Sequence, residues 1–166
     1  MEEKYMEQKI LKILEKDGRA TAKEIAEELC LDEKLVEKTI ADLEERGIIG
    51  GYKAMINWDK LDENLVSALI ELKVTPQLDQ GFDRVAEKIY QYDHVKNVYL
   101  MSSGNYDLSV LIEGKNLKDV AGFVAEKLAP MECISSTSTH FILKRYKDGG
   151  IIYETQTKDN RQVTGF

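Results

Sequence analysis

The spacing of apolar residues changes once along this chain, and the change divides it into two parts. Over residues 6–43, apolar side chains recur every three or four positions, which is the period of an amphipathic helix. From residue 65 onward, runs of alternating apolar and polar residues indicate half-buried strands, with two further stretches of helical spacing between them. The pattern therefore predicts a helical segment followed by a domain of mixed sheet and helices.

The first part is predicted to form three short helices joined by tight turns. The first covers residues 6–14, Thr21 followed by Glu24 is a capping-box pattern for the second, and Asp32 is a suitable N-cap for the third. This layout is typical of a helix-turn-helix with the third helix as its recognition helix. After Gly47, the sequence IIGGYKAMI predicts an extended hairpin or wing segment. A small helical bundle without a nucleic-acid role has the same spacing and remains an alternative.

The second part has the element order β-α-β-β-α-β, the split βαβ of ferredoxin-like sheets. Such a sheet carries helices on one face only, and its other face here is partly apolar, so pairing with a second copy through the sheets is expected. The predicted strands and helices cover, in order, residues 65–75, 78–92, 95–103, 106–112, 116–129 and 134–147.

The predicted fold class is therefore α+β, with a winged helix-turn-helix ahead of a ferredoxin-like domain. We place the helix-turn-helix at 1–50, a connector strand at 51–63, the ferredoxin-like domain at 64–147 and a C-terminal extension at 148–166. Within that extension, the sequence DGG predicts a turn into one more short strand at 151–155.

Composition limits the classes of function. The net charge is −7, from 23 basic and 30 acidic side chains, so no strong positive excess points to nucleic acid. No apolar run reaches the roughly 18 residues of a membrane-spanning helix, and the acidic N-terminus is unlike a signal peptide. With only Cys30 and Cys133, far apart, neither a disulfide framework nor a zinc cluster is expected. These features predict a reduced, cytoplasmic, globular protein with no membrane partner. Cys30 is predicted to be a small buried residue.

No catalytic or cofactor site is predicted. His94 and His140 are isolated and have no histidine or cysteine partner at metal-ligand spacing. The chain shows no nucleophile–base pattern and no phosphate-binding loop. An enzyme would rest on fold analogy alone, because sheets of this kind also host small monooxygenases and isomerases.

Three sequence pieces together carry a family resemblance. They are KDGR at 16–19, LEERGIIGGY at 43–52 and GNYDL at 104–108. In this order and spacing, and with a β-α-β-β-α-β domain after the helices, the chain resembles the leucine-responsive and asparagine-responsive (Lrp/AsnC) regulators over about residues 8–147. The resemblance implies a sequence-specific transcriptional regulator that acts as a homodimer, tetramer or octamer. Its second domain would bind a small effector, often an amino acid, that sets the oligomeric state.

The recognition helix is less basic than the family pattern, which is typically rich in arginine. Residues 32–46 hold three basic and six acidic side chains, so weak non-specific affinity for double-stranded DNA is expected, and two copies on one symmetric site would compensate. A ligand-sensing or interaction module with weak or lost DNA binding is therefore the alternative function. The candidate DNA contacts lie on the outward face of the third helix, near the start of the second, and in the wing: Lys34, Lys38, Ala41, Arg19, Lys23 and Lys53.

The candidate effector site is a glycine-containing loop. Gly104 lets the backbone approach a ligand, exposed amides can take a carboxylate, and Asp107 can meet an ammonium group. Thr139, from the run SSTST, would line the same pocket, and the resemblance places the loop near subunit contacts. The alternatives are an ordinary hairpin turn whose aspartate caps an amide, and a solvated strand for the hydroxyl run. The full set is Ser102, Ser103, Gly104, Asn105, Tyr106, Asp107 and Thr139.

Overall fold

The computed structural model describes residues 2–61, 65–75, 81–102 and 104–153. It divides into two compact units, Met1–Met55 and Ile56–Phe166, and the division falls inside the predicted connector. Within the described ranges, no helix is both long enough and apolar enough to cross a membrane.

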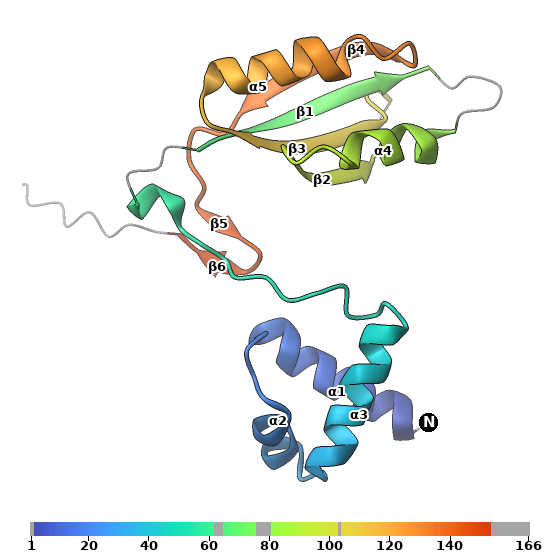
Figure 1. The fold of residues 1–166 in the computed structure, drawn as a ribbon, viewed down its shortest axis with the longest axis vertical. Coiled ribbons are helices and arrows are strands. Elements are labelled where there is room, and N and C mark those ends of the chain that lie inside the picture. The colour runs from blue at the N-terminus through green and yellow to red at the C-terminus, as the bar shows by residue number, and fades with distance from the viewer. Residues whose placement is uncertain (1, 62–64, 76–80, 103, 154–166) are drawn as a thin grey trace, which may run out of the picture. The chain divides into compact units, whose positions relative to one another are not determined.

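The first unit consists of three helices: α1 (Glu2–Lys16), α2 (Ala22–Leu29) and α3 (Glu33–Glu45), coloured blue to cyan in Figure 1. The predicted capping box is confirmed, because Glu24 N donates to Thr21 Oγ1 at 3.2 Å and Thr21 N donates to Glu24 Oε2 at 2.8 Å. Asp32 caps α3 by accepting from Leu35 N at 3.2 Å. These side chains satisfy amides that have no partner within the helix, which fixes where each helix begins.

The core of this unit is small. Its buried cluster consists of Ile10, Ile25, Ala26 and Val36. The prediction that Cys30 is buried is wrong: this residue is exposed and ends α2 in the left-handed conformation, with φ 55° and ψ 46°. Its N–H donates to Ala26 O, so its position is set by the helix terminus and not by its apolar side chain.

The chain after α3 turns at Gly47, where φ is +67°. The N–H groups of Ile48 and Ile49 both donate to Leu43 O, which satisfies the end of the helix. Residues 46–57 contain no strand, so the predicted hairpin does not form there.

The second unit is built on a four-stranded antiparallel sheet of order β2-β3-β1-β4, which confirms the split βαβ prediction. Helices α4 and α5 lie on the same side of this sheet in Figure 1. The described elements are a 3₁₀ turn at Trp58–Lys60, β1 (Val66–Val74), α4 (Phe82–Tyr90), β2 (Val95–Leu100), β3 (Leu108–Gly114), α5 (Leu117–Phe123) with a π turn at Val124–Leu128, β4 (Ile134–Phe141), β5 (Lys147–Asp148) and β6 (Ile151–Ile152).

Alternation along β1 separates the two faces of the sheet. The predicted apolar stripe packs under the helices, and Ile70 lies opposite Val110 on one side and Thr139 on the other. The buried cluster joins this stripe to residues of both helices, including Val85 and Val120. We call the other side the open face.

The end of β4 and the exposure of Leu117 differ from what the sequence indicates, whereas the predicted DGG turn is present. Strand β4 ends at Phe141 and not at 147, because its partner β1 begins at Val66 and offers only one more acceptor, Ser67 O, to Ile142 N. The helical spacing of residues 116–129 predicts Leu117 on the inward side, but this residue is 58% exposed, since α5 begins there and contacts the sheet through later residues. The predicted DGG turn does lead into a short strand, β6, which pairs with β5; residues 154 and 155 lie outside the described chain.

Candidate functional site

The outward face of α3 carries the predicted recognition residues. Val36 and Leu43 are buried on the opposite side, and Thr39 is held by a hydrogen bond from its Oγ1 to Leu35 O at 2.8 Å. This packing leaves Lys34 and Lys38 exposed, with Ala41 one turn further along the same face. The helix therefore presents two cations and a small side chain to solvent.

The acidic residues of α3 are partly engaged within the fold. Arg46 donates from Nη1 to Glu7 Oε1 at 2.8 Å and to Asp42 Oδ2 at 2.6 Å. These two hydrogen bonds, first that to Glu7, raise the pKa of the Arg46 guanidinium. Glu44 accepts from Tyr52 OH at 3.0 Å, and burial together with this carboxylate raises the pKa of the Tyr52 phenol. Arg46 is consequently committed to α1 and α3 and is a poor candidate for a DNA contact.

The remaining DNA-contact candidates are also exposed. Arg19 lies in the turn before α2 and Lys23 in the first turn of that helix, and the dipole of a helix N-terminus favours an anion. Lys53 follows Tyr52, whose hydrogen bond to Glu44 ties this segment to α3. The six candidates thus occupy three consecutive parts of one unit, all of them accessible to solvent.

The loop proposed as the effector site connects β2 to β3. Ser102, Gly104 and Asn105 are exposed and Tyr106 is half-buried, whereas Ser103 lies outside the described residues. Asp107 already has partners: its Oδ2 accepts from Val74 N at 2.8 Å and its Oδ1 lies 3.3 Å from Lys73 Nζ. This is the amide-capping arrangement that sequence reasoning held as the alternative for this residue.

Thr139 is not brought together with Asp107. It lies opposite Ile70 on the helix-covered face, whereas Lys73, which holds Asp107, projects from the open face of β1. Within a single chain, the two predicted parts of the effector site therefore lie on different faces of the sheet.

The open face carries polar groups whose contacts with one another were not predicted from the sequence. His140 Nε2 lies 3.1 Å from Glu71 Oε2 and 3.2 Å from Ser138 Oγ. Ser67 and Glu113 are direct neighbours across β1 and β3. The polar residues that alternate with the apolar stripes of these strands were the available signal, but nothing local indicated which distant residues would meet them.

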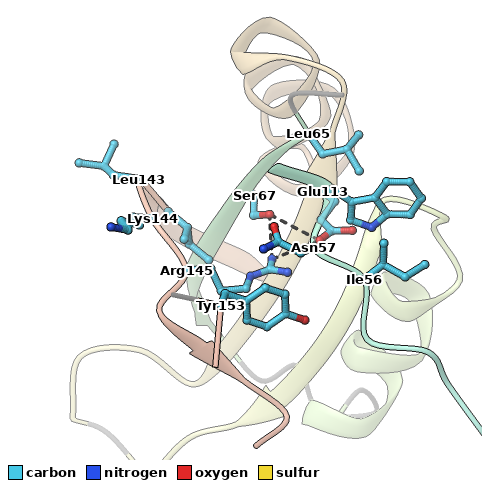
Figure 2. Close-up of a pocket in the computed structure, with 11 residues that line it drawn as sticks. Ile56, Asn57, Leu65, Ser67, Glu113, Leu143, Lys144, Arg145 and Tyr153 are labelled. Atoms are coloured by element: carbon cyan, nitrogen blue, oxygen red, sulfur yellow. Dashed lines mark hydrogen bonds and ion pairs between the residues drawn. The ribbon is translucent and has the colours of Figure 1, made fainter. Parts of the chain in front are cut away.

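A polar pocket of about 210 Å³ lies beside Ser67 and Glu113. Figure 2 shows Arg145 reaching toward these two side chains from the C-terminal segment, with Asn57 and Tyr153 on either side of its guanidinium. Its lining residues are Ile56, Asn57, Trp58, Leu65, Ser67, Glu113, Ile142, Leu143, Lys144, Arg145 and Tyr153. The connector and the extension, predicted as separate segments, thus meet at one site.

No metal site is found within the described chain, where no group of three or more histidine, cysteine, aspartate or glutamate residues is placed to hold an ion. His94 stacks on Phe123 with ring centroids 5.2 Å apart, and its Nε2 lies 3.5 Å from Asp119 Oδ1. The Asp119 carboxyl has a lowered pKa, chiefly because it accepts a hydrogen bond from Lys115 N, with His94 adding to the effect. These contacts give His94 a packing role.

Comparison with known proteins identifies both units. Residues 67–152 match the family model of the Lrp/AsnC ligand binding domain, and residues 5–49 match that of a winged helix-turn-helix DNA-binding domain. The HTH-type transcriptional regulator YugG of Bacillus subtilis is 46% identical over 95% of this chain and 95% of its own length. LrpA of Pyrococcus abyssi, also named an HTH-type transcriptional regulator, is 36% identical over 83% of this chain and 94% of its own.

The fold likewise has solved counterparts. The transcriptional regulator NMB0573 of Neisseria meningitidis, in a complex with L-Met, superposes with a TM-score of 0.69 at 22% identity, covering 86% of this chain and 91% of that one. At this identity the likeness concerns the fold. It agrees with the helix-turn-helix and the antiparallel α/β unit described above.

Proposed function

Because this chain belongs to the Lrp/AsnC family of DNA-binding transcriptional regulators, we propose that it binds promoter DNA through the outward face of α3. The observation that carries the proposal is the exposure of Lys34, Lys38 and Ala41 on the side of α3 opposite its buried stripe. A helix with this geometry enters the major groove, where its lysines meet phosphates and base edges. Arg19, Lys23 and Lys53 would add contacts to the phosphate backbone.

We further propose that the second unit binds a small effector and that this event changes the oligomeric state. The exposed loop residues Ser102, Gly104 and Asn105 are the proposed contact, and Thr139, which lies on the other face of the sheet within one chain, would contribute from a second copy. A Cβ atom added at Gly104 would meet no other atom within 4 Å, so Gly104→Ala should leave the fold intact while weakening an effector that approaches this backbone. Asp107, occupied by Val74 and Lys73, would hold the loop in place and would need Lys73 to move before it met an ammonium group.

A homodimer would form through the open face of the sheet, and tetramers or octamers would be built from it. Besides its polar side chains, this face carries Leu69, Leu111 and Tyr99. Two copies would bring two recognition helices to one symmetric operator. The dimer would therefore bind DNA more tightly than a single acidic helix does. Sedimentation velocity across a range of protein concentrations, with and without effector, tests this part of the proposal.

The DNA proposal is tested by fluorescence anisotropy against DNA upstream of the chain's own gene, from low to physiological salt. Each phosphate contact contributes about 0.9 to the slope of log affinity against log salt. Lys38→Glu is expected to abolish binding, whereas Glu45→Gln, which removes an acidic charge from the outward side, should strengthen it. Lys118→Glu, the same charge change on an exposed lysine of the other unit, serves as the control.

The second candidate function is a ligand-sensing module with weak or lost DNA binding, and the acidic composition of α3 favours it. Glu33, Glu37 and Glu45 are exposed there and oppose phosphate. This function predicts no anisotropy change even at low salt, together with thermal stabilisation of the protein by an amino acid. The relatives named above are regulators and not enzymes, which leaves fold analogy as the sole motive for an enzymatic role.

A further inference from the structure

We propose that Glu37 of α3 is a specificity-determining residue, and that its carboxylate reads a cytosine by accepting a hydrogen bond from the N4 amino group in the major groove. This role rests on the DNA-binding function proposed above, and it names one base that the recognition helix selects. It also gives a use to an acidic side chain that otherwise only opposes phosphate.

Glu37 lies within the outward face of α3. It is the fifth residue of the helix, three positions after Lys34 and four before Ala41, so it adjoins both on the helix surface. All three residues are exposed, whereas Val36 is buried on the opposite side. Residues near the N-terminus of a recognition helix contact base edges when the helix lies in the major groove. Glu37 is therefore placed among the side chains that meet bases.

The carboxylate of Glu37 is also available to a ligand. Two other carboxylates of α3 are held within the chain, since Asp42 accepts from Arg46 Nη1 at 2.6 Å and Glu44 accepts from Tyr52 OH at 3.0 Å. The Glu37 carboxylate, by contrast, has no hydrogen bond or ion pair with any described residue.

Lys34 is likewise unpaired among the described residues, although a lysine and a glutamate at this spacing are close enough to pair. The fold thus presents one carboxylate and one ammonium group side by side on the outward face, and neither is committed to a contact within the chain.

The charge of Glu37 limits what it can contact on DNA. A carboxylate only accepts hydrogen bonds and is repelled by phosphates, so its favourable partners are the amino groups of cytosine and adenine. Adenine has the acceptor N7 beside its N6 amino group, and this lone pair repels the second carboxylate oxygen. Cytosine has no acceptor beside N4, and its paired guanine offers O6 and N7 to a lysine. A carboxylate with a neighbouring ammonium group therefore matches a C·G pair best.

The other unpaired glutamates of α3 are less suitably placed. Glu33 shares a row of the helix with Val36 and Ile40, which pack toward the core, and Glu45 is the last residue of the helix. Glu33 therefore provides a matched control, because it has the same side chain and charge on the same helix but lies nearer its buried side.

Selection from a pool of random-sequence DNA duplexes tests this role with the full-length protein. The unaltered chain should enrich cytosine at one position of each half-site. Glu37→Gln should enrich adenine at that position, because an amide accepts a hydrogen bond from N6 and donates one to N7 of adenine.

Glu37→Ala should enrich no base at that position, with a loss of about tenfold in discrimination between the selected and a substituted base pair. It should also bind random DNA more tightly, because a charge that repels phosphate is removed. Glu33→Gln removes the same charge and should keep the cytosine preference, which separates base recognition from net charge.

A modified duplex identifies the atom that is recognised. The selected cytosine is replaced by an analogue that lacks only the 4-amino group, and affinity is measured by fluorescence anisotropy. The unaltered protein should lose about tenfold in affinity, whereas Glu37→Ala should bind the two duplexes equally. Because Glu37 is exposed and unpaired among the described residues, its variants should melt close to the unaltered protein.

The outcomes separate this role from DNA binding itself. The role is overturned if the two Glu37 variants select the same sequences as the unaltered protein, if Glu33→Gln changes the base preference equally, or if the selected base is not cytosine. In each of these cases the regulator proposal stands. If the unaltered protein retains no duplex even at low salt, DNA binding fails and the role of Glu37 fails with it.

Discussion

The two units are stabilised in different ways. The first has a buried cluster of four residues, and its helix boundaries are fixed by side-chain caps such as Thr21 and Asp32. The second has a buried cluster of fourteen residues beneath two helices, and its polar groups on the open face pair across long sequence distances. A small core leaves little margin for the loss of any one contact, so the first unit should depend far more on each local feature.

The largest difference between the two units is expected when a core side chain is truncated in each. Ile25→Ala and Ile70→Ala each truncate a fully buried isoleucine, at a cost of about 2–5 kcal/mol. Ile25→Ala should unfold the first unit near physiological temperature, whereas Ile70→Ala should leave the second folded with a lower melting temperature. Calorimetry with hydrogen exchange distinguishes the units; a single shared transition lowered equally by both variants would show that they do not differ.

A smaller test adds volume instead of removing it. A methyl group at Gly114, the last residue of β3, would lie 2.9 Å from both Asp119 Oδ2 and Val120 Cγ2. Gly114→Ala should therefore destabilise the second unit by about 1–3 kcal/mol, measured by urea denaturation. A methyl group at Gly122, in α5, would meet no such neighbour within 4 Å, so Gly122→Ala is the matched control and should stabilise by about 0.5–1 kcal/mol. Equal effects of the two variants would contradict tight packing at the end of β3.

The same difference explains what the sequence could predict. The starts of α2 and α3 were predictable because Thr21, Glu24 and Asp32 act on amides within three residues of themselves. The exposed face of α3 followed from its apolar stripe. Cys30 was mispredicted because residue type suggested burial, whereas the geometry at the end of α2 placed it at the surface.

In the second unit, alternation predicted the strands but not the polar pocket. Ser67 meets Arg145 across 78 residues and Glu113 across 46, and no local pattern specifies such pairings. The sequence also predicted the connector and the C-terminal extension as separate segments. It therefore did not indicate that Asn57 and Tyr153, one from each segment, line the same pocket. The loop 102–107 was located correctly between two strands, yet its role as an effector contact stays a prediction.

Removing a helix cap should affect the first unit more than the second. Thr21→Ala deletes the hydroxyl that accepts from Glu24 N, and Asn116→Ala deletes the amide oxygen that accepts from Asp119 N at 2.9 Å. Each change should cost about 0.5–2 kcal/mol, but only the first should visibly lower a melting transition at neutral pH, because its unit has the smaller margin. Thr21→Ser keeps the hydroxyl and is the control. A larger shift from Asn116→Ala would reverse the comparison.

The smallest expected effect is the pH dependence of each unit. Hydrogen bonds from Thr21, first its backbone N–H and then its hydroxyl, lower the pKa of Glu24 below its ordinary 4.5, and that from Lys115 N lowers the pKa of Asp119 below 3.8. A carboxylate whose pKa is lowered by folding stabilises the folded state when the pH is above the group's ordinary pKa. This stabilisation is lost as the pH falls through the lowered pKa. The first unit should therefore lose stability on acidification from about pH 4.5 downward, and the second from about pH 3.8 downward.

Neutral variants assign this loss to individual groups. Glu24→Gln keeps the hydrogen-bonding shape of the capping box but does not titrate, so the first unit's melting temperature should change less between about pH 5 and pH 3. Asp119→Asn should flatten the profile of the second unit in the same way and leave the first unchanged. If Glu24→Gln retained the full acid sensitivity of its unit, the capping-box carboxylate would not be its source. The distinction follows from charge, because the hydrogen bonds of the capping box survive in Glu24→Gln while its titrating carboxylate is removed.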